Sequence, residues 1–416
     1  MQRFAFLVLA LTVAACSDDD PIDPGKEPPV FTLHQLPLLG SGGVTERFTA
    51  EIAVRDGIAY TTTWGNRNGV RGDVVKVWNV NGNTPILVDS ISVPGAGTTS
   101  DVQISDDGRW LVVSTEGGIN NGLAIFDRSA SAQAPPLAKR HTSVSTVTGV
   151  HTVKLSRINN RLYAFMSINP GVFGGNPVFA KLVIADITDP ANTTEVFSQN
   201  MGNPFVHDVF VRDGILMTAE WADGMRIWDI GGGGRGGSPA NPVEISRVQT
   251  VNGHVHNIWW YHSPTGEKKY AFIGEENAAE LFTMSTGDIH VVDVSNLSNP
   301  REVAFFTVPA ATTSTGRFAG AHNFSMDEAS NILYAAYYNG GVRALDVSGD
   351  LSACSSTEKA PDGRCDLGLM KREVGRSLND LGRPVFIWGV QYVNSRVYAS
   401  DMIGGIHIID ASVLKK

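Results

Sequence analysis

Short runs of alternating apolar and polar residues, separated by turn residues, recur along the whole chain. One phrase occurs seven times as an apolar-alternating run that ends in Asp, or in Asn in its first copy. The copies are residues 74–79, 123–127, 182–186, 225–229, 289–293, 342–346 and 406–410. Alternation with a period of two, bounded by Gly, Asn, Asp and Pro, is typical of β-strands. A unit that recurs at a mean interval of about 55 residues predicts one large repetitive domain.

Each copy of the phrase is the third of four predicted strands. In the fourth repeat the strands are expected at residues 205–211, 215–219, 225–230 and 243–248. The first turn is Asp213-Gly214, a pair that favours a tight β-hairpin. Four consecutive antiparallel strands make a propeller blade. The other repeats begin near residues 48, 100, 149, 253, 320 and 384. The predicted fold is therefore all-β, a seven-bladed β-propeller of four-stranded antiparallel blades.

The two ends of the chain complete each other in this scheme. The seventh repeat stops after its third strand, because only residues 411–416 follow the phrase. An alternating segment at residues 30–39 precedes the first repeat and resembles the fourth strands elsewhere. We expect the N-terminal strand, at about residues 30–40, to complete blade seven and to remove the exposed edges of an open array.

The first fifteen residues have the form of an export signal. Arg3 supplies a positive charge, residues 4–13 form a short apolar core, and two alanines precede Cys16. The sequence Val13-Ala14-Ala15-Cys16 resembles a bacterial lipobox, which implies cleavage before Cys16 and its lipidation. The alternative is an ordinary signal peptide in which the Cys has no such role.

We therefore expect a signal peptide at residues 1–15 and a lipidated, solvated tether at residues 16–29. By the sorting rule for lipoproteins, Ser17 in place of Asp favours the outer membrane, in an organism that has one. No segment after residue 15 approaches the roughly 18 apolar residues of a membrane span. The formal net charge of −9 and the lack of a basic stripe argue against a nucleic-acid partner.

Two further cysteines, Cys354 and Cys365, flank a polar stretch. An exported protein lies where disulfides persist, so a bridge that closes this loop is expected. The alternative is a metal or redox pair, but the spacing is not that of a Cys-x-x-Cys motif and no His lies nearby.

The third-strand phrase, where Asp-Pro follows it, resembles the LVIVD repeat of bacterial exported proteins. The best matches are Leu182-Val183-Ile184-Ala185-Asp186, followed by Asp189-Pro190, and Val291-Val292-Asp293, followed by Asn299-Pro300. A third match, Trp228-Asp229-Ile230, precedes Asn241-Pro242 after an insertion. The resemblance covers about residues 30–416. It implies a β-propeller on an exported, often cell-surface-associated protein, and it implies no defined activity.

Four histidines occupy the same place, the start of the innermost strand, in four consecutive blades. They are His151, His207, His256 and His322. First strands surround the central channel of a propeller, so four converging imidazoles could hold Cu or Zn. Second-strand ends could add the carboxylates of Glu220 and of Glu275 or Glu276. The alternative is a structural role, in which each His packs between blades and hydrogen-bonds a neighbouring backbone group or Asp.

Other polar and aromatic features favour the scaffold. The repeated third-strand Asp residues are expected to cap the backbone of the following turn. The run Trp259-Trp260-Tyr261 could form a binding platform, but alternation places one ring in the core and the other between blades. The glycine-rich residues 231–237 lack the Lys and Ser/Thr of a phosphate loop and are interpreted as a flexible loop.

These observations predict an envelope protein whose propeller head is monomeric and binds another protein, a glycan or a small molecule. The inserted loops at residues 169–179, 231–238, 278–287 and 354–365 are candidate contact elements. The alternative is an enzyme with a channel-centred metal site built on the histidines, an oxidase or a hydrolase. No catalytic residue is assigned, and a transition metal is the cofactor that the histidines suggest.

Overall fold

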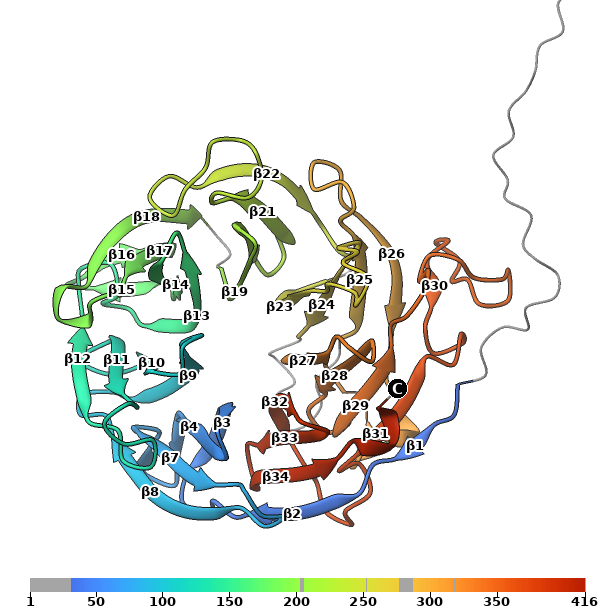
Figure 1. Cartoon of the computed structure of the whole chain (residues 1–416), viewed down its shortest axis with the longest axis horizontal. Coiled ribbons are helices and arrows are strands. Elements are labelled where there is room, and N and C mark those ends of the chain that lie inside the picture. Colours follow the sequence, from blue (N-terminus) through green and yellow to red (C-terminus); the bar gives the residue numbers. More distant parts are fainter. Residues whose placement is uncertain (1–30, 203–205, 252, 277–286, 318, 416) are drawn as a thin grey trace, which may run out of the picture.

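A computed structural model describes residues 31–202, 206–251, 253–276, 287–317 and 319–415 of the 416-residue chain. The signal peptide, Cys16 and the tether lie outside the described residues, as do residues 278–286 of one predicted contact loop. Seven sheets stand around a central channel like the blades of a propeller (Figure 1). The predicted fold class is confirmed.

Each blade is an antiparallel sheet whose first strand lines the channel and whose fourth strand lies at the rim (Figure 1). Blade one contains β3 (Phe48–Arg55), β4 (Ile58–Trp64), β7 (Val74–Asn79) and β8 (Ile86–Ser92). Blade two contains β9 (Thr98–Ile104), β10 (Trp110–Glu116), β11 (Gly122–Asp127) and β12 (Leu137–His141). Blade three contains β13 (Val150–Ile158), β14 (Arg161–Ile168), β17 (Ala180–Asp186) and β18 (Thr194–Gly202).

The second half of the ring repeats this order. Blade four contains β19 (Asp208–Arg212), β20 (Ile215–Ala219), β21 (Met225–Asp229) and β22 (Val243–Val248). Blade five contains β23 (Val255–Trp260), β24 (Tyr270–Glu275), β25 (Ile289–Asp293) and β26 (Arg301–Phe306). Blade six contains β27 (Phe324–Asp327), β28 (Ile332–Ala336), β29 (Val342–Asp346) and β31 (Glu373–Ser377). Blade seven contains β32 (Ile387–Val393), β33 (Arg396–Asp401), β34 (Gly405–Asp410) and the N-terminal β2 (Leu38–Gly42).

The N-terminal segment closes the ring, as predicted, but with a different register. Strand β2 pairs antiparallel with β34 and so completes blade seven. The residues that close the ring are therefore 38–42, at and beyond the end of the expected 30–40 segment. The preceding β1 (His34–Gln35) instead adds a parallel fifth strand to blade six, beside β31. One chain end therefore joins two blades.

The remaining elements are short. Two small hairpins extend from blades one and three, β5 (Asn66–Arg67) with β6 (Val70–Arg71) and β15 (Gly171–Phe173) with β16 (Asn176–Val178). In the part of the chain that the structure describes, 3-10 turns cover Pro190–Asn192, Ala310–Thr312 and Ser412–Leu414. Within the described residues no helix has the length and apolar character needed to cross a membrane.

The predicted disulfide joins Cys354 and Cys365, whose Cα atoms are 5.9 Å apart. It anchors β30 (Cys365–Asp366), which pairs in parallel with β26 and adds a fifth strand to blade five. The inserted loop is thereby fixed to the rim of the propeller.

All seven third-strand residues of the repeated phrase make the same hydrogen bond. The side-chain oxygen of each accepts the backbone N–H two residues on, which caps the turn that follows the third strand. The residues are Asn79, Asp127, Asp186, Asp229, Asp293, Asp346 and Asp410. Their predicted role in the scaffold is confirmed. Asp229 also accepts the backbone N–H groups of Gly233, Arg235 and Gly237, so it organises the glycine-rich loop.

Apolar side chains from neighbouring blades pack face to face to form the core. Phe165 and Leu182 of blade three, for example, lie in one buried cluster with Leu216 and Trp228 of blade four. This packing holds the first strands at a fixed distance from the channel axis, and it thus positions the side chains that point into the channel.

Candidate functional site

Six aromatic side chains form a closed ring across the channel, here called the aromatic ring. Neighbouring centroids lie 4.1–5.7 Å apart all the way around it. Its members are, in order, Trp64, His151, His207, His256, His322 and Trp388. The four predicted histidines are therefore brought together, and two indoles fill the gap left by the blades that lack one.

The first strands run from one face of the disk, past the aromatic ring, and along the channel. On one side the ring faces a cavity of about 560 Å³, here called the mouth cavity, lined by Trp64, Glu116, His151, Asn169 and His207 among others. On the other side the channel cavity, about 410 Å³, is lined by the next residues of the same strands. A space of about 20 Å³, enough for a single water-sized group, lies within the ring itself.

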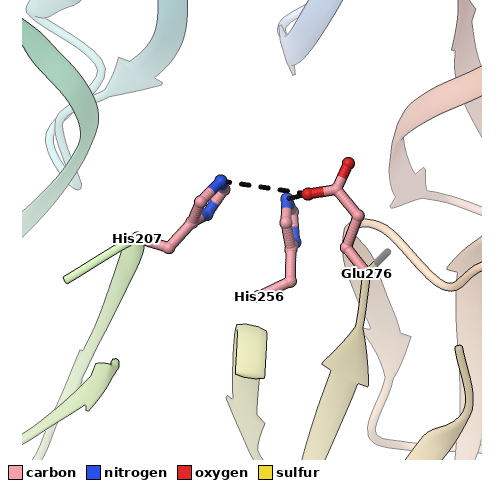
Figure 2. Close-up of side chains that lie close together, drawn as sticks. All are labelled: His207, His256 and Glu276. Carbon is pink, nitrogen blue, oxygen red and sulfur yellow. Dashed lines mark ion pairs between the residues drawn. The ribbon is translucent and has the colours of Figure 1, made fainter. Parts of the chain in front are cut away.

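Glu276, directly after β24, lies beside two of the ring histidines. Its Oε2 atom is 3.4 Å from Nε2 of His256 and 4.0 Å from Nε2 of His207. Figure 2 shows the three side chains, which come from blades four and five, pointing toward one another. One possible ligand atom from each of the three lies within 4.8 Å of the others, and all three residues are buried. The hydroxyl of Tyr338 donates a hydrogen bond to the second oxygen of Glu276.

His151 extends this cluster toward the mouth cavity. Its Nε2 atom is 2.9 Å from Nε2 of His207, and its Nδ1 atom is 3.1 Å from the Glu116 carboxylate. Glu116 also accepts hydrogen bonds from the Ser100 hydroxyl and the Asn169 side chain. His151 is thus oriented by a carboxylate behind it, an arrangement typical of metal-ligating histidines.

The protonation states differ around the ring. Burial disfavours the charged form of His151, but Glu116 outweighs this effect and the pKa of His151 is raised. Burial, together with the neighbouring histidines, holds the pKa of His207 and of His256 well below its usual range. Burial also raises the pKa of Glu276 to about 7. The cluster therefore contains neutral imidazoles, the form that binds metals.

His256 has the least satisfied side chain of the cluster. It is 2% exposed, and neither ring nitrogen makes a hydrogen bond among the described residues. Buried polar groups are normally paired, so such an atom needs an explanation, for example an ion.

The structure does not bring the other two predicted carboxylates to the histidines. Glu220 accepts hydrogen bonds from Arg226, at 2.6 Å, and from the Thr218 hydroxyl. Glu275 lies 3.0 Å from His290, on the opposite side of the strand from Glu276. His322 belongs to the ring, and its Nδ1 atom lies 3.8 Å from Glu51.

His290 forms a separate buried charge cluster between two carboxylates. Its ring nitrogens lie 3.0 Å from Glu275 and 2.8 Å from Glu302, and Arg364 forms an ion pair with Glu302. Burial opposes its charge, but the two carboxylates raise the pKa of His290 to about 9. The nearby Asp288 carboxyl is bound by the Thr307 hydroxyl, and burial raises its pKa.

The channel cavity is lined by three carboxylates, the buried Glu51 and Asp101 and the half-buried Asp208. Burial raises the pKa of each, and for Asp208 burial together with Asp101 raises the pKa to about 7. Trp259 lines this cavity beside Phe210, whereas Trp260 is buried in the core between blades. Alternation thus separates the two indoles, with Trp259 at the channel.

Two segments of the chain, residues 178–201 and 283–308, match the LVIVD repeat. No curated protein matches the sequence. Among solved structures, the structure of U3-55K is similar to this chain with a TM-score of 0.58 and 12% sequence identity. That similarity covers 90% of this chain and 98% of the other, and at this identity it concerns the fold alone.

Proposed function

From the premise that this chain is an LVIVD-repeat β-propeller protein, we propose that it is a lipid-anchored envelope protein that binds a sugar unit in its mouth cavity. The observation that carries the proposal is the lining of that cavity. The Trp64 indole, which the mouth cavity leaves partly exposed, offers a flat apolar wall. Glu116 and Asn169 offer carboxylate and amide groups beside it, and a volume of about 560 Å³ lies in the range of small-molecule sites.

Sugars suit such a lining because they have an apolar ring face and a rim of hydroxyl groups. Trp64 would stack against the ring face, as aromatic side chains do at sites that are apolar at one end and wet at the other. Glu116 and Asn169 are held in place by their mutual hydrogen bond, so they are pre-oriented to receive hydroxyl groups.

Binding is tested with glucose and N-acetylglucosamine as probes, by saturation-transfer NMR and calorimetry on the full-length protein. Asn169→Ala is expected to weaken binding of the better probe by about 10-fold, the loss of one hydrogen bond. Asn176→Ala is the matched control, since Asn176 lies at the exposed tip of the β15–β16 hairpin outside the cavity. Absence of binding by both probes, or unchanged binding by Asn169→Ala, would refute the sugar site.

The anchor is a separate part of the proposal, supported by the lipobox-like sequence. Cys16→Ser is expected to abolish incorporation of an alkyne-labelled fatty acid and to release the protein from the membrane fraction. Ser17→Asp is expected to move the protein from outer-membrane to inner-membrane fractions in a double-membraned host. A Cys16→Ser protein that keeps the label and the membrane association would exclude lipidation at this residue.

A second function, metal-dependent catalysis, is favoured by the cluster of His207, His256 and Glu276, of which His207 lines the mouth cavity. The test is the double variant His207→Gln/His256→Gln, assayed with a chromogenic ester and an oxidisable phenol. Loss of a wild-type turnover with intact folding supports an enzyme. Global destabilisation of the variant supports a structural role for these histidines.

A further inference from the structure

We propose that the propeller holds one divalent first-row transition-metal ion, bound by Nε2 of His207 and His256 and an oxygen of Glu276, with His151 as the fourth ligand. This inference goes beyond sugar binding and is independent of it. It rests on the geometry, the burial and the surroundings of these four side chains.

The separations between the donor atoms suit a single ion. In a tetrahedral zinc site with metal–ligand distances near 2.0 Å, neighbouring donor atoms lie about 3.3 Å apart. Here the donor atoms are separated by 2.9 Å for His151 to His207, 3.4 Å for His256 to Glu276 and 4.0 Å for His207 to Glu276. The donors of His207, His256 and Glu276 already lie within 4.8 Å of one another, whereas His151 lies outside that group and would reach the ion by rotation of its side chain from beside His207.

The ligand types select the class of metal. Imidazole nitrogen with one carboxylate oxygen suits Zn²⁺, Cu²⁺ and similar ions, whereas Mg²⁺ and Ca²⁺ prefer sites made of oxygen. The two cysteines among the described residues, Cys354 and Cys365, form a disulfide at the rim, so neither supplies a thiolate ligand.

The surroundings of the donors match those of metal ligands. The Glu116 carboxylate accepts a hydrogen bond from Nδ1 of His151, the ring nitrogen that faces away from the cluster. The Tyr338 hydroxyl donates a hydrogen bond to Glu276 and holds that carboxylate in place. Tyr338 has a backbone φ of 40°, a left-handed conformation that is rare for a bulky residue. Such strain is typically retained where a side chain must be aimed at a functional site.

Two observations distinguish this cluster from an ordinary buried network. His256 is 2% exposed and makes no hydrogen bond through either nitrogen among the described residues, and a metal bond would satisfy its Nε2 atom. The mouth cavity reaches His151 and His207, so an ion has a path of entry.

The experiment uses the full-length protein, stripped with a chelator and then titrated with Zn²⁺, with Co²⁺ as a spectroscopic probe. We expect one ion per chain by elemental analysis, visible absorption typical of four-coordinate Co²⁺, and a higher melting temperature with Zn²⁺. Glu276→Gln and His256→Gln should each weaken Zn²⁺ binding by more than about 100-fold. Tyr338→Phe should weaken it by about 10- to 100-fold, the effect usual for a residue that orients a ligand.

His262→Gln is the matched control, because His262 lies in the same blade beyond β23 and outside the aromatic ring. It should bind Zn²⁺ as the wild type does. Circular dichroism and gel filtration establish that each variant is folded. Wild-type protein that retains no ion after loading and shows no shift in melting temperature would overturn the proposal. Equal affinity of Glu276→Gln, His256→Gln and wild type would overturn it as well. None of these readouts requires a sugar, so their failure leaves the mouth-cavity proposal separately testable.

Discussion

Replacement of Leu36 by alanine should destabilise the whole propeller, although Leu36 lies near the start of the described chain. Its side chain is 1% exposed and packs in one cluster with residues of blades six and seven. A methyl group added at Gly375 would lie only 3.1 Å from Leu36 and 3.0 Å from Leu414, which shows how closely the three residues meet. The Leu36 N–H donates to the Arg376 carbonyl at 2.8 Å, and the Leu36 carbonyl accepts from the Ser377 hydroxyl at 2.9 Å.

The magnitude follows from the burial. Removal of a fully buried leucine side chain leaves a cavity and costs about 2–5 kcal/mol. We expect about 3 kcal/mol for Leu36→Ala, because Leu414 is close to the chain end and can partly relax into the space. Leu33→Ala is the control in the same segment, since Leu33 is 44% exposed. It should change the free energy of unfolding by less than about 0.5 kcal/mol.

The assay is urea unfolding followed by tryptophan fluorescence, which the eight tryptophans spread over the chain make a report on the whole ring. Deletion of residues 31–42 should lower the urea midpoint further, because β34 loses its partner strand β2. Closure of the ring by the N-terminal segment would be refuted if Leu36→Ala matched Leu33→Ala, or if the deleted chain unfolded at the wild-type midpoint.

Three further predictions concern the rim and the buried charges. Replacement of Cys354 and Cys365 by serine should cost about 2–3 kcal/mol in urea unfolding, from the lost loop constraint, and equal stability with and without reductant would contradict this. The pKa of His290 is raised to about 9, so its charged form should add on the order of 3 kcal/mol to the free energy of unfolding. This stabilisation should be complete below about pH 6.5 and lost as the pH rises through 9. His290→Gln should lack this alkaline loss in unfolding measurements from pH 6 to 10. Backbone N–H groups outweigh burial and lower the pKa of Asp229 to about 2, so its contribution should be present above about pH 4 and lost as the pH falls through 2. Asp229→Ala should therefore lower the free energy of unfolding by about 2–4 kcal/mol at neutral pH, measured by urea unfolding. An equal loss at pH 2 would contradict the assignment of this stabilisation to the ionised carboxylate.

The propeller could be predicted from the sequence because its signals are local. Period-two alternation and turn residues mark every third strand, and hairpin pairs such as Asp213-Gly214 adopt the left-handed φ values, 50° and 70°, that tight hairpins need. The added strands β1 and β30 could not be predicted in this way. Each is two residues long and pairs in parallel with a distant segment, so neither leaves a periodic pattern.

The histidines could be predicted because they stand at equal offsets in successive repeats, but their carboxylate partners could not be fixed as well. In a strand, successive side chains point to opposite faces. Glu275 and Glu276 therefore diverge, the first toward His290 and the second toward His256, and a sequence offset of one residue decides between them. Trp64 ends a second strand without repetition in other blades, so no pattern marked it. Glu116 ends β10 as Glu275 ends β24, so the recurrence of Glu at second-strand ends could have pointed to it.

The contrast between the Asp and His positions indicates where the molecule departs from a symmetric scaffold. A residue that serves the scaffold of a repeat is needed in every blade, and the third-strand Asp or Asn makes the same turn hydrogen bond in all seven. The histidines occur in only four adjacent blades, and Ala50, Ser100 and Trp388 hold the equivalent positions in the other three. Around these four the hydrogen-bond partners also differ, since His151 has Glu116 behind it and His256 has no hydrogen bond among the described residues. The ring can fold without this asymmetry. A ligand bound off the channel axis, beside blades three to five, requires side chains that differ between these blades and the others.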